Sequence, residues 1–234
     1  MKILYEDVDI VAVAKPAGLI THSDGRTKEE TAEDWFKEKY EGGLASPKPC
    51  GGGYVHRLDR DTSGVLVFAK NAMAYEFMRK AFHDRDIKKT YLAVVYGVPK
   101  EKSGVIDFDI GRSRQNFRLR SAQPKAKGRL RDALTRYEVI GEAEDCALMK
   151  LSPETGRTHQ IRVHLKAIHH PIVCDPLYAP NHKPALGITR LALHASTLDI
   201  PLPSGGRAII EAPIPEDLSV ALAHFPREWP APNA

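Results

Sequence analysis

The sequence predicts an α+β protein whose sheet is largely antiparallel, with helices and loops beside it. Short apolar or alternating runs typical of strands outnumber the helical patterns along the 234 residues. These runs mostly follow one another directly, without a long series in which strands alternate with helices. No repeat, low-complexity tract or break in composition divides the chain, so we expect a single domain over residues 1–234.

The N-terminal part contains one strand signal and one helix signal. The apolar run from Ile10 to Ala14 predicts a strand. Thr27 and Glu30 have the spacing of a capping box, which predicts the start of a helix that the Gly42-Gly43 pair ends. Residues 44–53 hold several prolines and glycines and predict a loop.

A buried strand and a capped helix follow. Ser63 and Gly64 form a turn before the continuous apolar run Val65–Phe68, which is typical of a strand buried on both faces. Asn71 is then placed to cap a helix. The apolar residues of that helix recur at helical spacing: Ala74, Phe77, Met78, Ala81 and Phe82.

The second half of the chain continues the pattern of strands. Strands are predicted at residues 88–97, from residue 105 to the start of the basic segment, at 133–140 and at 146–151, and as a pair within 190–213. Thr158 is placed to cap a helix from His159 to Ile168, on which Ile161 and Leu165 share a face.

Positive charge is concentrated in one segment. The chain carries a formal charge of +4, yet eight bases and no acid lie between residues 112 and 131. The remainder holds 26 of the 34 lysines and arginines against 30 acids, so one basic segment on a mildly acidic body indicates a polyanion site. We predict a projecting hairpin-like loop at about residues 111–131. Its bases are Arg112, Arg114, Arg118, Arg120, Lys125, Lys127, Arg129 and Arg131.

Composition argues against several other classes of protein. No apolar stretch reaches the roughly 20 residues that span a bilayer, and the N-terminal segment MKILYEDVDI lacks the features of a signal peptide. We therefore expect a cytoplasmic protein without a membrane partner. Cys50, Cys146 and Cys174 are too widely spaced to indicate a disulfide framework or a zinc ribbon. His159 and His164 are five residues apart and H-E-x-x-H is absent, so we predict no metal site.

Asp59 is the first candidate for chemistry. It lies among ionisable residues directly before the buried strand, where a carboxylate beside arginines stays ionised yet partly dehydrated. The alternative is a turn residue or a structural partner of an arginine. Asp59 and Asp61 also form a D-x-D pair, which would suit a metal site or a glycosidase. An extended backbone disfavours that interpretation, because it would point the two carboxylates to opposite faces.

Tyr91 and Arg162 each have a structural and a functional interpretation. Tyr91 lies in a predicted strand and is either a half-buried sheet tyrosine or a ring that stacks on a base. Arg162 lies on the predicted helix and is either a surface residue or a cation that keeps a carboxylate ionised. Neither residue establishes a function alone.

Taken together, the segments resemble the RluA-type RNA pseudouridine synthases. The matching segments occur in the family's order over nearly the whole chain: KPAGLITH (15–22), HRLDRDTSGVLVFAKN (56–71), KKTYLAVVYG (88–97), ETGRTHQIRVHL (154–165), PIVCDPLYA (171–179) and RLALHA (190–195). Cys174 and Ala179 depart from the pattern, in which glycine is expected. The resemblance implies the pseudouridine synthase fold, and we expect no separate N-terminal RNA-binding module.

The resemblance also implies roles for individual residues. Asp59 matches the catalytic aspartate, Tyr91 the tyrosine that stacks on the target base, and Arg162 the arginine that pairs with the aspartate. Arg57 matches the arginine implied in displacing the target nucleotide. The other expected RNA-binding residues, beside the eight bases above, are Arg60, Lys89, Arg157, His159 and Gln160.

The implied reaction isomerises uridine to pseudouridine in a structured stem-loop of tRNA or large-subunit ribosomal RNA, or both. It needs no cofactor, because it involves no net redox change or hydrolysis, and no protein partner, so we expect a monomer. Asp59 would attack the base, attack the sugar, or abstract a sugar proton to form a glycal, and the sequence leaves all three open. Two competing classes remain: a non-catalytic RNA-binding or chaperone protein, and a metal-dependent nuclease or glycosidase that uses Asp59 and Asp61.

Overall fold

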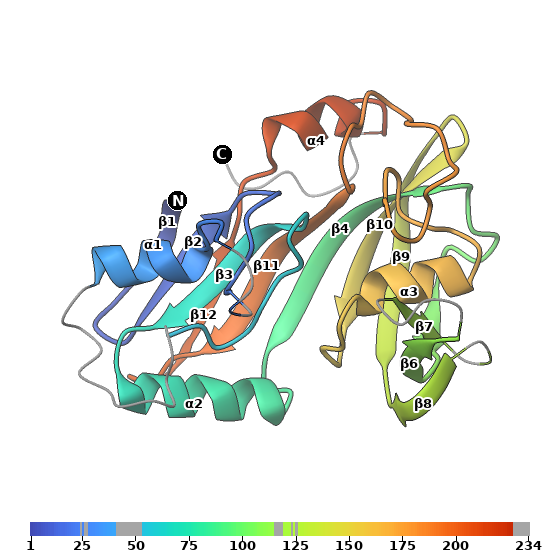
Figure 1. Ribbon diagram of the computed structural model, residues 1–234. Coiled ribbons are helices and arrows are strands. Elements are labelled where there is room, and N and C mark those ends of the chain that lie inside the picture. Colours follow the sequence, from blue (N-terminus) through green and yellow to red (C-terminus); the bar gives the residue numbers. More distant parts are fainter. Residues whose placement is uncertain are drawn as a thin grey trace. The chain divides into compact units, whose positions relative to one another are not determined.

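The structure is a computed structural model that describes residues 1–23, 25, 28–40, 53–114, 119–122, 124 and 126–226. The chain folds as two compact units, whose helices and strands are labelled in Figure 1. The first unit comprises Met1–Lys89 and Ala195–Pro213. The second comprises Thr90–His194 and Ile214–Ala234.

The first unit contains a sheet in which β1, β2, β3 and β11 are neighbours in this order and β12 pairs with β11. The β1–β2, β2–β3 and β11–β12 pairs are antiparallel. β11 belongs to this unit from Ala195 onward. The strands are β1 (Lys2–Glu6), β2 (Ile10–Lys15), β3 (Ser63–Ala69), β11 (Leu193–Pro201) and β12 (Arg207–Glu211).

Strand β3 is buried along its whole length because both of its faces are covered. Val67 joins a core cluster that includes Met78 of α2 (Ala72–His83). Phe68 points to the opposite face, where its ring stacks on Phe36 of α1 (Ala32–Lys39) at 4.8 Å between centroids. This double burial confirms the interpretation of the continuous apolar run and explains why the strand contains no polar side chain after Ser63.

The two helices of this unit differ in how well their starts were predicted. Asn71 caps α2 as predicted, since its Oδ1 accepts a hydrogen bond from the Ala74 amide at 2.9 Å. The predicted box at Thr27 and Glu30 was about one turn too early, because Thr31 and Asp34 form the capping box of α1. Thr27 itself and the predicted stop and loop at residues 41–52 lie outside the described residues.

The second unit contains a sheet with the order β4-β10-β9-β5, in which all three pairings are antiparallel. β4 belongs to this unit from Thr90 onward. Its core includes Leu148 of β10, Leu165 of the helix α3 and Leu222 of the helix α4. The elements are β4 (Lys88–Tyr96), β5 (Ser103–Asp107), β9 (Leu134–Ala143), β10 (Cys146–Pro153), α3 (Gln160–Ala167) and α4 (Glu216–Leu222).

Helix α3 begins differently from the prediction. Its N-cap is His159, not Thr158, and His159 adopts the left-handed conformation at φ 58° without a side-chain cap. The side chain of Gln160 takes over part of the capping, because its Oε1 accepts a hydrogen bond from the amide of Arg157 at 3.0 Å. Six consecutive residues, from Gln160 to Leu165, are buried, so α3 is a core helix and not a half-exposed amphipathic one.

The basic segment is a small sheet, which corrects the prediction of a hairpin-like loop. Three antiparallel strands have the order β7-β6-β8: β6 (Ile110–Ser113), β7 (Arg120–Ala122) and β8 (Ala126–Arg131). The sheet forms because Ile110 and Ala122 are buried in one apolar cluster with Val163 of α3. These few apolar contacts are hidden in the sequence among the eight bases.

The predicted α+β class with a largely antiparallel sheet is confirmed. β1 and α4 were not predicted. Cys174 adopts a left-handed conformation at φ 56°, a backbone geometry that glycine adopts with less strain. In the described part of the chain, no helix is long and apolar enough to cross a membrane.

Candidate active site

Asp59 lies in the turn that leads into β3. Its carbonyl accepts a hydrogen bond from the Thr62 amide at 3.1 Å. Immediately before it, both backbone groups of Leu58 bond to the hydroxyl of Thr21, at 2.9 Å from the carbonyl and 3.2 Å from the amide. Leu58 and Thr62 are buried whereas Asp59 is half-buried. The carboxylate therefore lies where the core meets solvent, on a backbone that is fixed on both sides.

The buried side chain of Lys15 also fixes the turn at Asp59. The Nζ atom of Lys15 donates to the carbonyls of Pro16 at 2.8 Å, Leu19 at 2.7 Å and Arg60 at 3.0 Å. Lys15 is 1% exposed, so these carbonyls compensate the loss of water around its ammonium group. The contact joins the KPAGLITH segment to the residue that follows Asp59.

The two arginines beside Asp59 differ in their surroundings. Arg57 is exposed. Arg60 forms an exposed ion pair with Glu29, in which Nη2 and Oε2 lie 2.7 Å apart, and its Nε donates to the Gly18 carbonyl at 3.1 Å. Arg60 therefore ties the turn to the segment before α1.

His56 is held in its neutral form. Its Nε2 accepts a hydrogen bond from the amide of Val67 at 3.1 Å, and its ring stacks on Phe82 of α2 at 4.6 Å. Burial, together with the positive charge of Lys89, lowers the pKa of His56 to about 3. Because this ring nitrogen accepts a hydrogen bond from a backbone amide of β3, His56 positions the HRLD turn on that strand.

Tyr91 lies in β4 of the second unit, opposite Leu151 of β10. Its ring is half-buried and packs against the apolar core of that unit. Lys89, two residues before it, belongs to the first unit and is half-buried.

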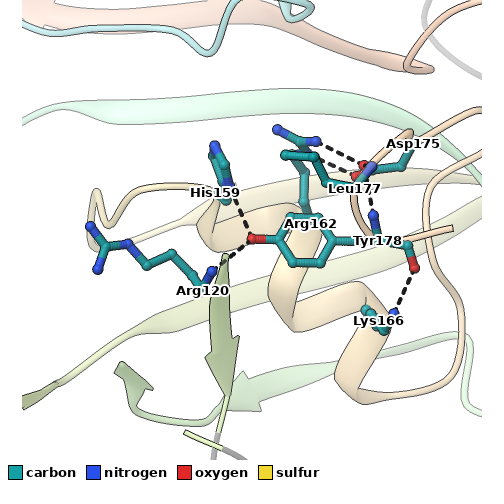
Figure 2. Close-up of polar contacts among 7 residues, drawn as sticks. All are labelled: Arg120, His159, Arg162, Lys166, Asp175, Leu177 and Tyr178. Carbon is teal, nitrogen blue, oxygen red and sulfur yellow. Dashed lines mark hydrogen bonds and ion pairs between the residues drawn. The ribbon is translucent and has the colours of Figure 1, made fainter. Parts of the chain in front are cut away.

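Among the described residues of the predicted site, Arg162 is the most deeply buried charge. It forms a bidentate ion pair with Asp175, in which Nε lies 2.8 Å from Oδ2 and Nη2 lies 2.7 Å from Oδ1 (Figure 2). The two side chains are 4% and 0% exposed. Oδ1 also accepts from the amides of Leu177 and Tyr178, at 2.9 Å and 3.0 Å. These bonds hold the carboxylate that orients the guanidinium.

Sequence reasoning missed Asp175 and Tyr178 as contacts of Arg162. The Tyr178 ring lies beside Arg162, whose guanidinium carbon is 5.1 Å from the ring centroid. Both residues belong to the segment PIVCDPLYA. An acid and a tyrosine three residues apart in a matching segment were the available signal.

Gln160 is enclosed by protein groups. Its Oε1 accepts from the Thr155 hydroxyl at 2.7 Å as well as from Arg157, and its Nε2 donates to the carbonyl of Leu134 and the hydroxyl of Thr135, both at 3.0 Å. The side chain of Arg157 is partly exposed and pairs with Asp132 at 2.8 Å. Gln160 thus fixes the first turn of α3 against β9.

The small sheet presents a surface of like charge. Arg112 of β6 lies directly opposite Arg120 of β7 and Lys127 of β8. Like charges in cross-strand pairs repel each other, and within the described residues none of the basic residues here pairs with a carboxylate. The exposed bases are Arg112, Arg114, Lys127, Arg129 and Arg131. Arg118 and Lys125 lie outside the described residues.

No group of three or more potential metal ligands occurs among the residues that the structure describes. The first unit carries the half-buried carboxylate of Asp59, and the second carries the buried guanidinium of Arg162, the sheet tyrosine Tyr91 and the basic sheet. Such groups suit acid–base or nucleophilic chemistry on an anionic polymer.

Comparison with known proteins agrees with this chemistry. The family described as RNA pseudouridylate synthase matches residues 9–167. An uncharacterized RNA pseudouridine synthase of Mycobacterium bovis is 40% identical over 233 residues, which cover 95% of this chain and 72% of that protein. The ribosomal large subunit pseudouridine synthase D of Nitrosomonas europaea is 36% identical over 229 residues, covering 95% and 64%. Human RNA pseudouridylate synthase domain containing 4 has a similar structure, with a TM-score of 0.76, 25% identity and coverage of 95% and 92%.

These matches confirm the resemblance that the motifs indicated. The family match covers more than half of the chain, and the M. bovis relative is similar over nearly all of it. The chain belongs to the RNA pseudouridylate synthases of the RluA type, isomerases that act on RNA.

Proposed function

We propose that Asp59 is the catalytic residue with which this enzyme isomerises uridine to pseudouridine in a structured RNA stem-loop. The observation that carries the proposal is the HRLD turn. Contacts from Thr21, Lys15 and Arg60 fix the backbone around Asp59, while the carboxylate stays half-buried at the entrance to β3.

The reaction explains why one carboxylate suffices. The C1′–N1 bond of uridine breaks, a C1′–C5 bond forms, C5 loses its proton and N1 gains one. A partly dehydrated aspartate can act as the nucleophile or as the base for such a rearrangement. Attack on the base, attack on the sugar and glycal formation all remain consistent with this arrangement.

The proposed partners of Asp59 are Tyr91, Arg162 and Arg57. On the basis of the matching motifs, Tyr91 stacks on the target base, Arg162 pairs with Asp59, and Arg57 takes part in displacing the nucleotide. The bidentate pair with Asp175 supports this role, because it fixes the plane of the Arg162 guanidinium.

The basic sheet is the proposed grip on the RNA backbone. Flipping a uridine out of its stack costs a few kcal/mol, and phosphate contacts offset part of that cost. We extend this role to Arg60, Lys89, Arg157 and His159, as the motifs imply. Gln160 receives a positioning role instead, since the four hydrogen bonds of its amide all go to protein groups.

We propose a stem-loop of large-subunit ribosomal RNA, of tRNA, or of both as the substrate. The name of the N. europaea relative, ribosomal large subunit pseudouridine synthase D, favours the ribosomal RNA. The shape of an RNA loop decides which uridine can leave its stack, so mapping pseudouridines in RNA identifies the target nucleotide.

Release of tritium from RNA that contains 5-tritiated uridine tests the proposal. The wild-type enzyme should release tritium from total cellular RNA, and Asp59→Ala should release none above background. Asp61→Asn is the matched control, because it removes a neighbouring carboxylate of the same turn and should retain activity. Equal release by the wild type and Asp59→Ala contradicts the proposal, and loss of activity on adding a chelator would instead favour a metal-dependent enzyme.

A further inference from the structure

Tyr178 lies at the centre of a set of contacts to which the reaction assigns no role. It follows α3 in the chain and is 4% exposed. Figure 2 shows its ring beside α3, with polar contacts to its hydroxyl at one end and to its backbone amide and carbonyl at the other. The Lys166 ammonium adds a contact to the Tyr178 carbonyl at 2.9 Å.

The hydroxyl of Tyr178 joins the basic sheet to the start of α3. The amide of Arg120 in β7 donates to Oη at 3.2 Å, and Nδ1 of His159 lies 2.9 Å from the same oxygen. β7 has three residues and is an edge strand, so one extra hydrogen bond is a substantial part of what holds it. The Arg120 side chain extends away from Tyr178 in Figure 2, and its charge remains on the basic sheet.

The ring of Tyr178 supports Arg162. The guanidinium carbon lies 5.1 Å from the ring centroid, within the range of a cation–π contact. The amide of Tyr178 also donates to the Asp175 carboxylate that orients Arg162. One side chain therefore contacts both the RNA grip and the arginine of the proposed active site.

We propose that Tyr178 is a positioning residue whose hydroxyl ties β7 of the basic sheet to α3, while its ring holds Arg162 in place. This inference rests on the proposed function, since it takes the basic sheet as the RNA grip and Arg162 as a partner of Asp59. The two ends of the side chain have separable effects. The hydroxyl acts on RNA binding alone, whereas the ring, which also packs in one apolar cluster with Ile110 and Ala122 of the basic sheet, acts on turnover as well.

Two substitutions separate these effects. Tyr178→Phe keeps the ring and removes the hydroxyl, so KM for the RNA should rise about 3- to 10-fold while kcat changes less than about twofold. Tyr178→Leu removes the ring as well, and kcat should then fall by about tenfold. A residue that merely stabilised the fold would lower the apparent kcat through the folded fraction and would leave KM unchanged.

Tyr96→Phe is the matched control in the same unit. The Tyr96 hydroxyl also bridges two backbone groups, donating to the Lys183 carbonyl at 2.7 Å and accepting from the Cys174 amide at 3.2 Å. Its loss should leave KM for RNA unchanged. A rise in KM equal to that of Tyr178→Phe would overturn the inference.

Amide hydrogen exchange tests whether the Tyr178 hydroxyl holds β7 to α3, and this test does not require enzyme activity. In Tyr178→Phe, the amides of β7 and of the first turn of α3 should exchange faster than in the wild type, while those of β9 and β10 should not. Unchanged exchange in β7 overturns the inference. An inactive wild-type enzyme would contradict the proposed function alone, because the exchange measurement still tests whether the Tyr178 hydroxyl holds β7 to α3.

Discussion

Arg162 and Asp175 form a bidentate ion pair that is almost completely buried, with side-chain exposures of 4% and 0%. Arg190 and Asp217 form a second bidentate pair in the same unit, but their side chains are 17% and 48% exposed. The two pairs differ mainly in burial. The exposed pair therefore serves as the reference for the buried one: the free energy of unfolding lost on breaking each pair can be compared within one protein.

Asp175→Asn should destabilise the protein by about 3–5 kcal/mol, because it removes the carboxylate that forms the bidentate pair with a buried guanidinium. Asp217→Asn should cost at most about 1 kcal/mol, since its pair is exposed to solvent. Urea unfolding of both variants measures the difference. Equal midpoints for the two variants would show that Arg162 does not depend on Asp175 for charge compensation.

Lys15→Met should cost about 3 kcal/mol of unfolding free energy, because it removes the buried ammonium group to which three carbonyls bond. Loss of the contact to the Arg60 carbonyl should also loosen the turn at Asp59 and reduce kcat by up to about 100-fold. Lys70→Met is the control, since Lys70 bonds to Glu6 and to the Asp7 carbonyl, away from the turn. Full activity in the folded Lys15→Met enzyme would show that Lys15 is not needed to hold the turn at Asp59.

Protonation of His56 should contribute to unfolding in acid. Burial and Lys89 lower its pKa in the folded protein to about 3 from an ordinary value of 6.5, so the unfolded chain binds a proton that the folded one does not. The titration of His56 therefore does not change the free energy of unfolding above about pH 6.5. Below that pH it lowers the free energy of unfolding toward pH 3, at up to about 1.4 kcal/mol per pH unit.

Gln at position 56 can still accept from the Val67 amide but does not titrate. The free energy of unfolding of His56→Gln, measured from pH 8 to pH 4, should consequently fall less steeply below pH 6.5 than that of the wild type. His83→Gln, at an 88% exposed side chain, should follow the wild-type slope. Identical slopes for the wild type and His56→Gln would mean that His56 is not kept neutral by the fold.

RNA binding should weaken steeply with salt if the basic sheet contacts phosphates. Replacing Arg112 or Arg129 by Gln should reduce the slope of log Kd against log salt concentration by about 0.7–0.9 for each contact removed. Arg136→Gln removes an exposed base of β9 that pairs with Glu154, and it should leave the slope unchanged. An unaltered slope in the Arg112 and Arg129 variants would place the RNA elsewhere.

The elements with strong local signals were predicted correctly from the sequence. Val65–Phe68 is a continuous apolar run because both faces of β3 are covered, and Asn71 caps α2 as its position indicated. α4 was missed because its N-cap is Pro215, which offers no side-chain acceptor. The small sheet was missed because Ile110 and Ala122 bury their side chains against Val163, a residue distant in the sequence.

The surroundings of Arg162 could not be predicted for a related reason. The motif match pointed to Arg162, but the carboxylate that orients it belongs to a loop 13 residues further along the chain. Likewise, the bond between Arg120 and Tyr178 joins residues 58 positions apart. Periodicity and capping rules describe neighbours along the chain, so contacts of this kind appear only in the folded structure.

The central claim is that Asp59 carries the isomerisation of uridine. It is tested most directly by mapping pseudouridines in cellular RNA from cells that lack the gene and are complemented with wild type or with Asp59→Asn at equal protein levels. The account predicts at least one uridine that is converted with the wild type and remains unconverted with Asp59→Asn. Full conversion of that uridine by Asp59→Asn would contradict the account.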